Sequence, residues 1–380
     1  MMEEHSRDCG SPCIMRTKGI KALDSISIRG FKSIASIDNL KLSPVNLVIG
    51  ANGSGKSNFL GVFGLLRTIG EGRKARKDYI EAAGGANRLL HFGSKTTKEI
   101  ELSLTFGGVD LEPLGELHHS MSIRLEQTEN DSLFMSDFEP LSVPEFDETE
   151  VQSRGLRDDT FNVLATWRVY HLNDTSSSSP LRKSASLDDN RFLRPDGSNL
   201  AAFLYYLRKR HDAEFNLIAR TVRRVAPFFE NFISMPLQNH PDLIKLEWRH
   251  AQSDQYFDAS ALSDGTLRFI FLATLLLQPE EHRPSIILID EPELGLHPHA
   301  IELLAALIRQ ASVTNQVIVS TQSPLLLDQF EPEDVLVAEL VDGATRIKRL
   351  DSQHLKTWLE DYSLGQLWEK NEIGGRPVAG

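Results

Sequence analysis

Cysteine is almost absent from this sequence, since its 380 residues contain only Cys9 and Cys13. A fold held together by disulfides is therefore excluded, and the composition fits a reducing compartment such as the cytoplasm. His5 lies near the two cysteines and completes a set of three possible metal ligands. Three candidate ligands in a terminal stretch without periodicity are a weak signal, so we expect no metal site there.

Long apolar runs are also missing. The longest lies around residues 269–277, which is too short to cross a bilayer. The first residues are acidic and polar and lack the apolar core of a signal peptide. We therefore expect a cytoplasmic protein that needs no membrane.

Positive charge is scarce, because 41 Lys and Arg residues stand against 53 Asp and Glu residues, for a net charge of −12. Nucleic-acid binding through bulk charge is excluded, and any such role needs a local basic surface. The basic runs at 72–77 and 220–224 are the two candidates. A solvated helix face is the simpler interpretation of each run, and neither contains the interleaved aromatic residues typical of base stacking.

Hydrophobic patterning predicts an α/β fold with a mostly parallel sheet covered by helices on both faces. We expect strands at 25–34, 45–50, 99–106, 243–249, 285–290 and 316–320. We expect helices at 58–69, 199–211, 215–229, 266–278 and 300–311. The acidic stretch 137–150 and the serine-rich stretch 173–190 predict loops.

The stretch GANGSGKS, at residues 50–57, matches the phosphate-binding pattern G-x-x-x-x-G-K-[ST] and lies between a predicted strand and a predicted helix. Its glycines let backbone N–H groups surround a triphosphate, and the helix N-terminus adds its dipole. Lys56 then reaches the β- and γ-phosphates, while the Ser57 hydroxyl binds Mg²⁺. This P-loop, residues 50–57, predicts that the chain binds ATP and Mg²⁺.

A second motif, SIILIDEPELGLHP at residues 285–298, begins as an apolar strand and reaches Asp290 and Glu291. An Asp at the carboxyl end of a parallel strand lies beside a P-loop and can hold Mg²⁺ directly or through water. The following Glu can orient or deprotonate the attacking water. An acidic strand end without a catalytic role is the alternative, which the P-loop disfavours. His297 and His299 flank a proline and are expected to be interface or capping residues.

With these motifs, the sequence resembles ABC-type ATPase heads of the SMC/RecF branch, in the compact stand-alone form known as AAA family ATPases. The resemblance covers most of residues 22–375 and rests on SISIRGFKSI, GANGSGKSN, LSDGTLRF, LIDEPELGLHP and VSTQSP. WRVYHLNDTS (167–176) and RFLRPDGSNLAAFL (191–204) also resemble segments of uncharacterised members. It implies a P-loop NTPase fold with a mostly parallel core sheet flanked by helices, an antiparallel β subdomain and an inserted helical region.

This resemblance also suggests a division of the chain. We expect an N-terminal extension at 1–21, followed by the N-terminal part of the ATPase head with the P-loop at 22–108. An insertion with acidic loops and a helical lid would span 109–260. The C-terminal part of the head, with the signature, the Asp290 strand and the switch, would span 261–350, and a helical tail 351–380.

The resemblance implies roles for individual residues. Those expected to bind the nucleotide are Asn52, Gly53, Ser54, Gly55, Lys56, Ser57 and Asn58. LSDGTLRF, at 262–269, stands where the family has its signature, so Ser263 and the Gly265 backbone would contact the γ-phosphate held by the other subunit of an ATP-dependent homodimer. A helix cap is the other interpretation of Ser263, and the two are compatible. Because a carboxylate repels phosphate, we expect the Asp264 side chain to point away.

The sequence departs from the family pattern at two places. Gln322 stands where many relatives carry histidine, and it can donate a hydrogen bond to the γ-phosphate but cannot become a cation. The glutamine that links the two lobes and touches Mg²⁺ is missing, because no Gln occurs between residues 58 and 126. Asn87 or His91 is a possible substitute, although structural roles are commoner for such residues.

We therefore expect an ATPase whose ATP-dependent head dimer acts on DNA or senses it, in repair, segregation or anti-phage defence. The sequence has no long coiled coil and no recognisable nuclease motif, so any cleavage would come from a partner effector encoded nearby. The alternatives are the ATPase subunit of a membrane transporter, which the missing glutamine disfavours, and a nucleotide switch with negligible turnover, which Glu291 disfavours.

Overall fold

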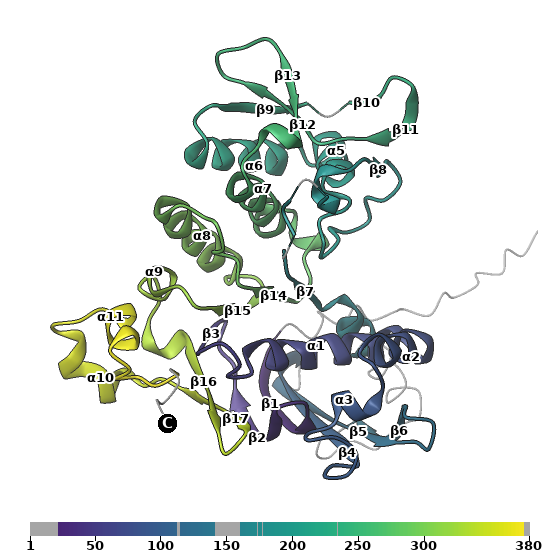
Figure 1. Ribbon diagram of the computed structural model, residues 1–380, viewed down its shortest axis with the longest axis vertical. Coiled ribbons are helices and arrows are strands. Elements are labelled where there is room, and N and C mark those ends of the chain that lie inside the picture. The colour runs from purple at the N-terminus through teal and green to yellow at the C-terminus, as the bar shows by residue number, and fades with distance from the viewer. Residues whose placement is uncertain are drawn as a thin grey trace, which may run out of the picture.

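The computed structural model describes residues 22–111, 115–140, 160–172, 174–176, 178–233 and 235–375. Its centre is a six-stranded sheet in the order β17-β16-β3-β15-β14-β7 (Figure 1). The strands are β3 (Val45–Ile49), β7 (Arg168–Tyr170), β14 (Ile286–Asp290), β15 (Gln316–Thr321), β16 (Val335–Val341) and β17 (Ala344–Arg349). All neighbours are parallel except β16 and β17. The carboxyl ends of the five parallel strands therefore meet at one edge.

The central strands consist of buried apolar residues because both faces of the sheet are covered. Along β14, Ile286 and Leu288 pack into one core, whereas Ile287 and Ile289 pack into the other. The same alternation occurs in β15, where Ile318 faces one side and Val317 and Val319 face the opposite side. A strand with two buried faces shows a continuous apolar run rather than an alternating pattern.

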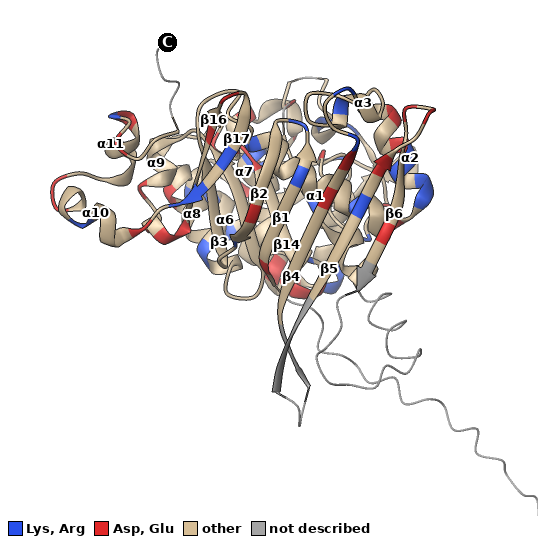
Figure 2. Ribbon diagram, turned by 90° about the horizontal axis from the view of Figure 1, so that it is seen from below, with Lys and Arg blue, Asp and Glu red and all other residues tan. Residues whose placement is uncertain are grey.

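One face is covered by helix α1 (Lys56–Glu71) and a five-stranded antiparallel sheet in the order β2-β1-β4-β5-β6. These strands are β1 (Leu23–Phe31), β2 (Ile34–Lys41), β4 (Glu99–Leu111), β5 (Gly115–Gln127) and β6 (Leu133–Pro140). Helices α2 (Arg73–Ala82) and α3 (Ala86–Leu89) connect α1 to this sheet. Basic and acidic residues are interspersed along its outer face (Figure 2), as in the ion pairs from Arg124 to Glu99 and Glu101.

The other face is covered by helices of the second half of the chain and by an inserted lobe, at the top of Figure 1. The lobe contains α5 (Leu200–Arg210), α6 (Asp212–Val225) and two small sheets, and α7 (Asp264–Leu277) packs against α6. Its strands are β8 (Ala185–Ser186), β9 (Phe229–Ile233), β10 (Pro236–Leu237), β11 (His240–Ile244), β12 (Glu247–His250) and β13 (Tyr256–Asp258). Helix α8 (Pro298–Ala311) packs beside α7.

The end of the described chain returns to the P-loop. After α9 (Pro324–Leu327), α10 (Ser352–Leu359) and α11 (Leu364–Glu369), the chain reaches Gly375. The Gly375 carbonyl accepts a hydrogen bond from the Ala51 N–H at 2.5 Å, and the Gly375 N–H donates to Glu339 Oε1 at 3.0 Å. A segment far from the P-loop in sequence thus supports its backbone.

The loop predicted at 137–150 is wrong at its start, because residues 137–140 belong to β6, and the loop predicted at 173–190 contains the short helical turn Pro180–Arg182 and strand β8. Most of the predicted strands and helices are present, with three differences. The strand expected at 25–34 is a hairpin, because Lys32, with φ of 47°, turns the chain between β1 and β2. The strand expected at 243–249 is divided between β11 and β12, and the helix expected at 215–229 ends at Val225, before β9. None of the helices formed by the described residues has the length and hydropathy needed to cross a membrane. The predicted extension 1–21, with His5, Cys9 and Cys13, lies outside the described residues.

Candidate functional site

The P-loop backbone requires glycine at the positions where it turns. Gly53 and Gly55 have φ of 82° and 99°, in the region that side chains with a Cβ atom rarely adopt. A Cβ atom on Gly55 would lie 2.0 Å from Thr345 Oγ1, so β17 closes against the loop there. Helix α1 begins at Lys56, directly after this turn, which leaves its first N–H groups directed toward the loop.

Lys56 is buried, and its ammonium group faces the loop. Its Nζ atom donates to the carbonyl oxygens of Gly50 at 2.6 Å and Ala51 at 3.0 Å. Burial lowers the pKa of Lys56, although the nearby carboxylates of Glu291, Asp290 and Glu293 oppose this shift. The cation is therefore positioned between the P-loop and the acidic strand end, where a phosphate group would gain most from it.

The other predicted nucleotide-binding side chains differ in burial and in hydrogen bonding. Asn52 and Ser57 are exposed, whereas the buried Ser54 hydroxyl has no hydrogen-bond partner among the described residues. Asn58 donates through Nδ2 to Ser33 Oγ at 2.7 Å, which ties α1 to the turn between β1 and β2. The Asn58 side chain thus supports the loop in this structure rather than facing outward from it.

Asp290 ends β14 and is buried beside two polar neighbours. The Ser320 hydroxyl, on β15, donates to its Oδ1 atom. His171, which directly follows β7, places its Nδ1 atom 3.1 Å from Asp290 Oδ2, without the geometry of a hydrogen bond. Because β7 runs parallel to β14, these two residues lie at the same edge as the P-loop.

Glu291 contacts the predicted switch residue directly. Its backbone has φ of 48°, and the Gln322 side-chain amide donates from Nε2 to Glu291 Oε1. The buried Glu293 carboxylate accepts from Thr321 Oγ1 at 2.7 Å and from the Gln322 N–H at 3.0 Å. Burial raises the pKa of Glu293. Glu293 therefore holds the chain after β15 in place, and Gln322 in turn holds the carboxylate of Glu291.

Ser263 and Gly265 begin α7 and have local structural roles. Ser263 is the N-cap, because its Oγ atom accepts from the Thr266 N–H at 3.1 Å. A Cβ atom on Gly265 would lie 2.3 Å from the carbonyl oxygen of Gly295, so the loop after Asp290 packs directly on this glycine. Ser263 is nevertheless exposed, and capping leaves it at the surface.

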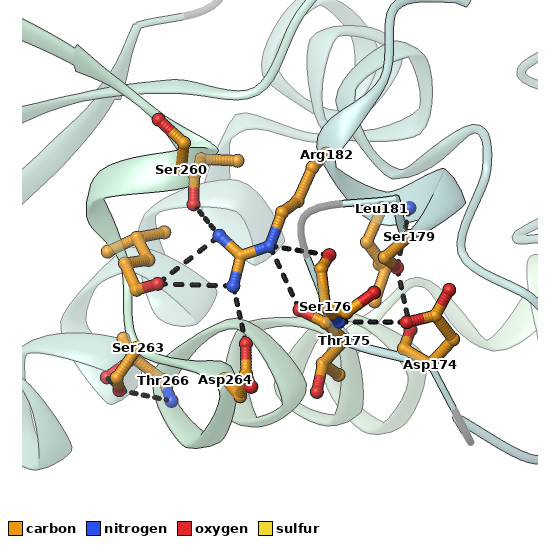
Figure 3. Close-up of polar contacts among 12 residues, drawn as sticks. Asp174, Thr175, Ser176, Ser179, Leu181, Arg182, Ser260, Ser263, Asp264 and Thr266 are labelled. Carbon is orange, nitrogen blue, oxygen red and sulfur yellow. Dashed lines mark hydrogen bonds and ion pairs between the residues drawn. The ribbon is translucent and has the colours of Figure 1, made fainter.

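The Asp264 carboxylate is held by an arginine of its own chain. Arg182 Nη2 lies 2.6 Å from Asp264 Oδ1, and the guanidinium also donates to the carbonyl oxygens of Ala259 and Leu262 (Figure 3). Its Nε atom donates to the carbonyl oxygens of Thr175 and Ser176 at 2.9 and 3.1 Å. Arg182 thus fixes the signature loop, residues 262–265, against the segment that follows β7.

A family model described as "AAA domain, putative AbiEii toxin, Type IV TA system" matches residues 45–328, about three quarters of the chain. The chain belongs to this AAA-domain family. No curated protein sequence matches it significantly.

Solved structures similar to this AAA-domain protein include two Smc heads. One is the SmcHead bound to the C-winged helix domain of ScpA, with a TM-score of 0.59 and 19% identity, covering 88% of this chain and 99% of that chain. The other is the Smc head domain with an extended coiled coil, bound to the C-terminal domain of ScpA, from Pyrococcus furiosus. Its TM-score is 0.55 and its identity 16%, over 89% of this chain and 98% of that one. These likenesses confirm the predicted fold class, an α/β fold in which a mostly parallel core sheet is flanked by helices and by an antiparallel sheet.

The AAA-domain family implies a nucleotide and, typically, Mg²⁺, and the residues present fit both. The buried Lys56 ammonium suits phosphate oxygens, as does the Ser54 hydroxyl, which has no partner in the described part of the chain. Ser57 and Asp290 carry oxygen atoms of the kind that Mg²⁺ prefers. Asn87 and His91 have other partners, because Asn87 Oδ1 accepts from Ser94 N and His91 Nδ1 contacts the Lys32 carbonyl. His297 is the N-cap of α8, which is one of the two roles expected for it, interface or capping residue.

Two residues of this site were not predicted from the sequence. His171 lies in WRVYHLNDTS, and the only available signal was its place directly after a short apolar stretch. Arg182 lies in a polar, serine-rich stretch that gave no signal, because its partners in and beside the signature loop are 77 to 82 residues away in the sequence. Both depend on long-range contacts that local patterns do not encode.

Proposed function

We propose that this protein hydrolyses ATP with Mg²⁺ at the edge where the parallel strands end. One observation carries the proposal: strands β3, β15 and β14 are adjacent and parallel, and the candidate residues lie at their carboxyl ends. The P-loop follows β3, Gln322 follows β15, and Asp290 ends β14 directly before Glu291. Mg²⁺, when bound, would neutralise phosphate charge and hold the β- and γ-phosphates in place. Ligands of open α/β sheets bind at this edge, beyond the carboxyl ends of the strands.

Each residue of this site would have a separate role in ATP binding or hydrolysis. Lys56 binds the phosphate oxygens through its ammonium group, and Ser57 and Asp290 supply oxygen ligands. Glu291 accepts the proton of the attacking water at its carboxylate, in an orientation maintained by the hydrogen bond from Gln322 Nε2 to Oε1. Gln322 would also donate to the γ-phosphate when the hydrogen bond to Glu291 is exchanged.

We further propose that two copies close on ATP. Ser263 is exposed at the start of α7. The first backbone N–H groups of α7 would form an anion site, as the N-termini of helices do. The Asp264 carboxylate pairs with Arg182, so its negative charge is directed to the guanidinium group and not to the proposed anion site. A second copy would then place Ser263 and the Gly265 backbone on the γ-phosphate of the first.

The closed dimer would act on DNA or sense it for an effector protein such as a nuclease. The exposed residues Arg220, Arg223 and Arg224 on α6 support this role, because they are spaced to share one helix face. Such a surface offsets the unfavourable net charge of −12 only locally.

The decisive experiment uses Glu291→Gln, which slows hydrolysis and traps the ATP state. We expect this variant to become a dimer with ATP and Mg²⁺ by mass measurement, and to retain added DNA. Lys56→Ala is the matched control and should remain a monomer. A permanent monomer would exclude the closed dimer, and a dimer without DNA retention would exclude the DNA role. Wild-type turnover that is lost in Glu291→Gln would rule out a switch without turnover.

Mixing two inactive variants tests whether the signature acts across the dimer. Ser263→Arg disables the signature contact that each chain offers to its partner's nucleotide, and Lys56→Ala disables the P-loop that holds a chain's own nucleotide. In a mixed dimer one composite site is intact, so we expect activity to return partly. Absence of any recovery would leave Ser263 as a helix cap alone.

A further inference from the structure

Three side chains with metal-ligating atoms converge where the inserted lobe meets the connection from α7 to β14, before the amino end of β14 and so away from the ATP site. His211 separates α5 from α6, while Glu281 and His282 lie in the short helical turn Glu280–His282 that joins α7 to β14. Their ligand atoms all lie within 4.8 Å of one another, the one such group of three among the described residues. The two segments that meet here are about 70 residues apart in the sequence.

The spacing of these atoms is close to that of a tetrahedral ion site. Glu281 Oε1 lies 3.5 Å from His211 Nε2 and 3.8 Å from His282 Nε2. Bonds of about 2.0–2.1 Å to a tetrahedral ion place neighbouring ligand atoms about 3.3 Å apart. Small side-chain rotations would therefore bring all three atoms to bonding distance.

A fourth group completes the cluster. Tyr206 Oη lies 3.1 Å from His282 Nε2 and 3.4 Å from His211 Nε2, so the same nitrogen atoms face one phenol oxygen. The His211 and His282 rings are perpendicular, with centroids 5.3 Å apart, so they do not stack on each other. Only one of two imidazole nitrogens can accept the single phenol proton, whereas an ion between them would accept lone pairs from both.

We propose that His211, Glu281 and His282 bind a Zn²⁺-type transition-metal ion. Two imidazole nitrogens and one carboxylate form a donor set that suits zinc, while Mg²⁺ prefers oxygen ligands only. The His side chains are 20% and 17% exposed and Glu281 is 68% exposed, so the ion reaches the site from solvent and exchanges with it. Tyr206 or a water molecule supplies the fourth ligand.

The bound ion would join the inserted lobe to the core. His211 directly precedes α6, and Glu281 and His282 follow the C-terminal end of α7, the helix that begins in the signature loop. An ion that bridges these segments fixes the far end of α7 against α6. Metal binding would thus stabilise the orientation of the signature helix without touching the nucleotide.

The test is metal binding by the full chain after removal of ions with a chelator. We expect one Zn²⁺ per chain by elemental analysis, and a visible absorption spectrum of tetrahedral type when Co²⁺ replaces it. Excess Mg²⁺ should not displace either ion. Zn²⁺ should raise the melting temperature of the wild type by mass action.

Glu281→Gln is the informative variant, since its exposed side chain can be replaced without loss of the fold. We expect Glu281→Gln to weaken Zn²⁺ binding at least about tenfold and His282→Gln to abolish it. His299→Gln, which changes the exposed pair of His299 and Glu302 on α8, is the matched control and should bind as the wild type does. Equal binding by all these proteins, or none by the wild type, would overturn the proposal.

Discussion

Asp264 carries a negative charge within the signature loop. In the sequence it stands between Ser263 and Gly265, where a negative charge opposes phosphate binding. In the structure its carboxylate contacts Arg182, whose side chain is only 9% exposed and donates to four backbone carbonyl oxygens as well. Asp264 therefore completes the set of acceptors around a buried guanidinium, and the orientation expected from the sequence agrees with this contact.

A double-mutant cycle on Arg182 and Asp264 measures this contact. Since Asp264 is 61% exposed, we expect a coupling energy of about 1 kcal/mol in unfolding experiments. Arg182→Ala alone should cost more, because it leaves backbone carbonyl groups without a donor. Asp264→Asn should change ATP affinity by less than about twofold. A large gain in ATP affinity would instead show that the carboxylate faces the nucleotide.

Glu293 gives a pH dependence of stability with a definite sign. Burial raises its pKa in the folded protein, so the folded state binds more protons than the unfolded state above the unfolded pKa of about 4.3. Its contribution to the unfolding free energy therefore decreases as pH rises through this window. We expect Glu293→Gln, which keeps an oxygen acceptor for Thr321 and Gln322, to gain stability relative to the wild type when the pH is raised from about 4, below the unfolded pKa of a glutamate, to about 7. Urea unfolding at both pH values measures the difference, and an unchanged difference would contradict the assignment.

Helices and strands are predicted well from the sequence where their hydrophobic pattern repeats over neighbouring residues. The continuous apolar runs of β3, β14 and β15 and the helical periodicity of α1, α7 and α8 identify the core and the place of the P-loop. The break between β11 and β12 escapes this reasoning, because a bend inside an alternating run leaves the alternation unchanged. His171, Arg182 and the return of Gly375 to the P-loop depend on tertiary contacts, which local patterns cannot encode.

The segment from residue 371 to Gly375 provides a prediction at this scale. Truncation after Lys370 removes the carbonyl that accepts from the Ala51 N–H. We expect the KM for ATP to rise about threefold to tenfold, since one backbone hydrogen bond contributes about 0.5–1.5 kcal/mol, with kcat little changed. Truncation after Gly375 is the matched control and should leave KM unaltered. Equal KM values for the two truncations would mean that this segment does not support the loop.

Over the whole molecule, the two basic runs lie on different lobes, α2 beside the antiparallel sheet and α6 in the inserted lobe (Figure 1). They differ in their partners. On α2, Arg76 is buried and Lys77 pairs with Glu81 at 3.5 Å. Arg220, Arg223 and Arg224 have no ion-pair partner among the described residues and remain exposed. The α6 face is therefore the better candidate for a DNA contact.

Charge reversal distinguishes these two faces. Replacing Arg220, Arg223 and Arg224 by Glu should reduce DNA retention by the ATP-bound dimer by at least about tenfold and flatten its salt dependence. The same reversal of Arg73, Lys74 and Lys77 is the control and should have a smaller effect. ATP-dependent dimer formation without DNA should be similar for both. Equal losses from the two faces would mean that net charge, rather than the α6 surface, governs binding.

The segment between β7 and Arg182 touches two places that serve different nucleotides in the proposed dimer. It begins at His171 beside Asp290, which belongs to the site of its own chain, and ends on the signature loop offered to the partner. Nucleotide binding at the site of one chain would therefore alter the position of the signature loop that this chain offers to the second nucleotide. Hydrolysis should then be cooperative in ATP, with a Hill coefficient above one and at most about two, and Arg182→Ala should return it to about one.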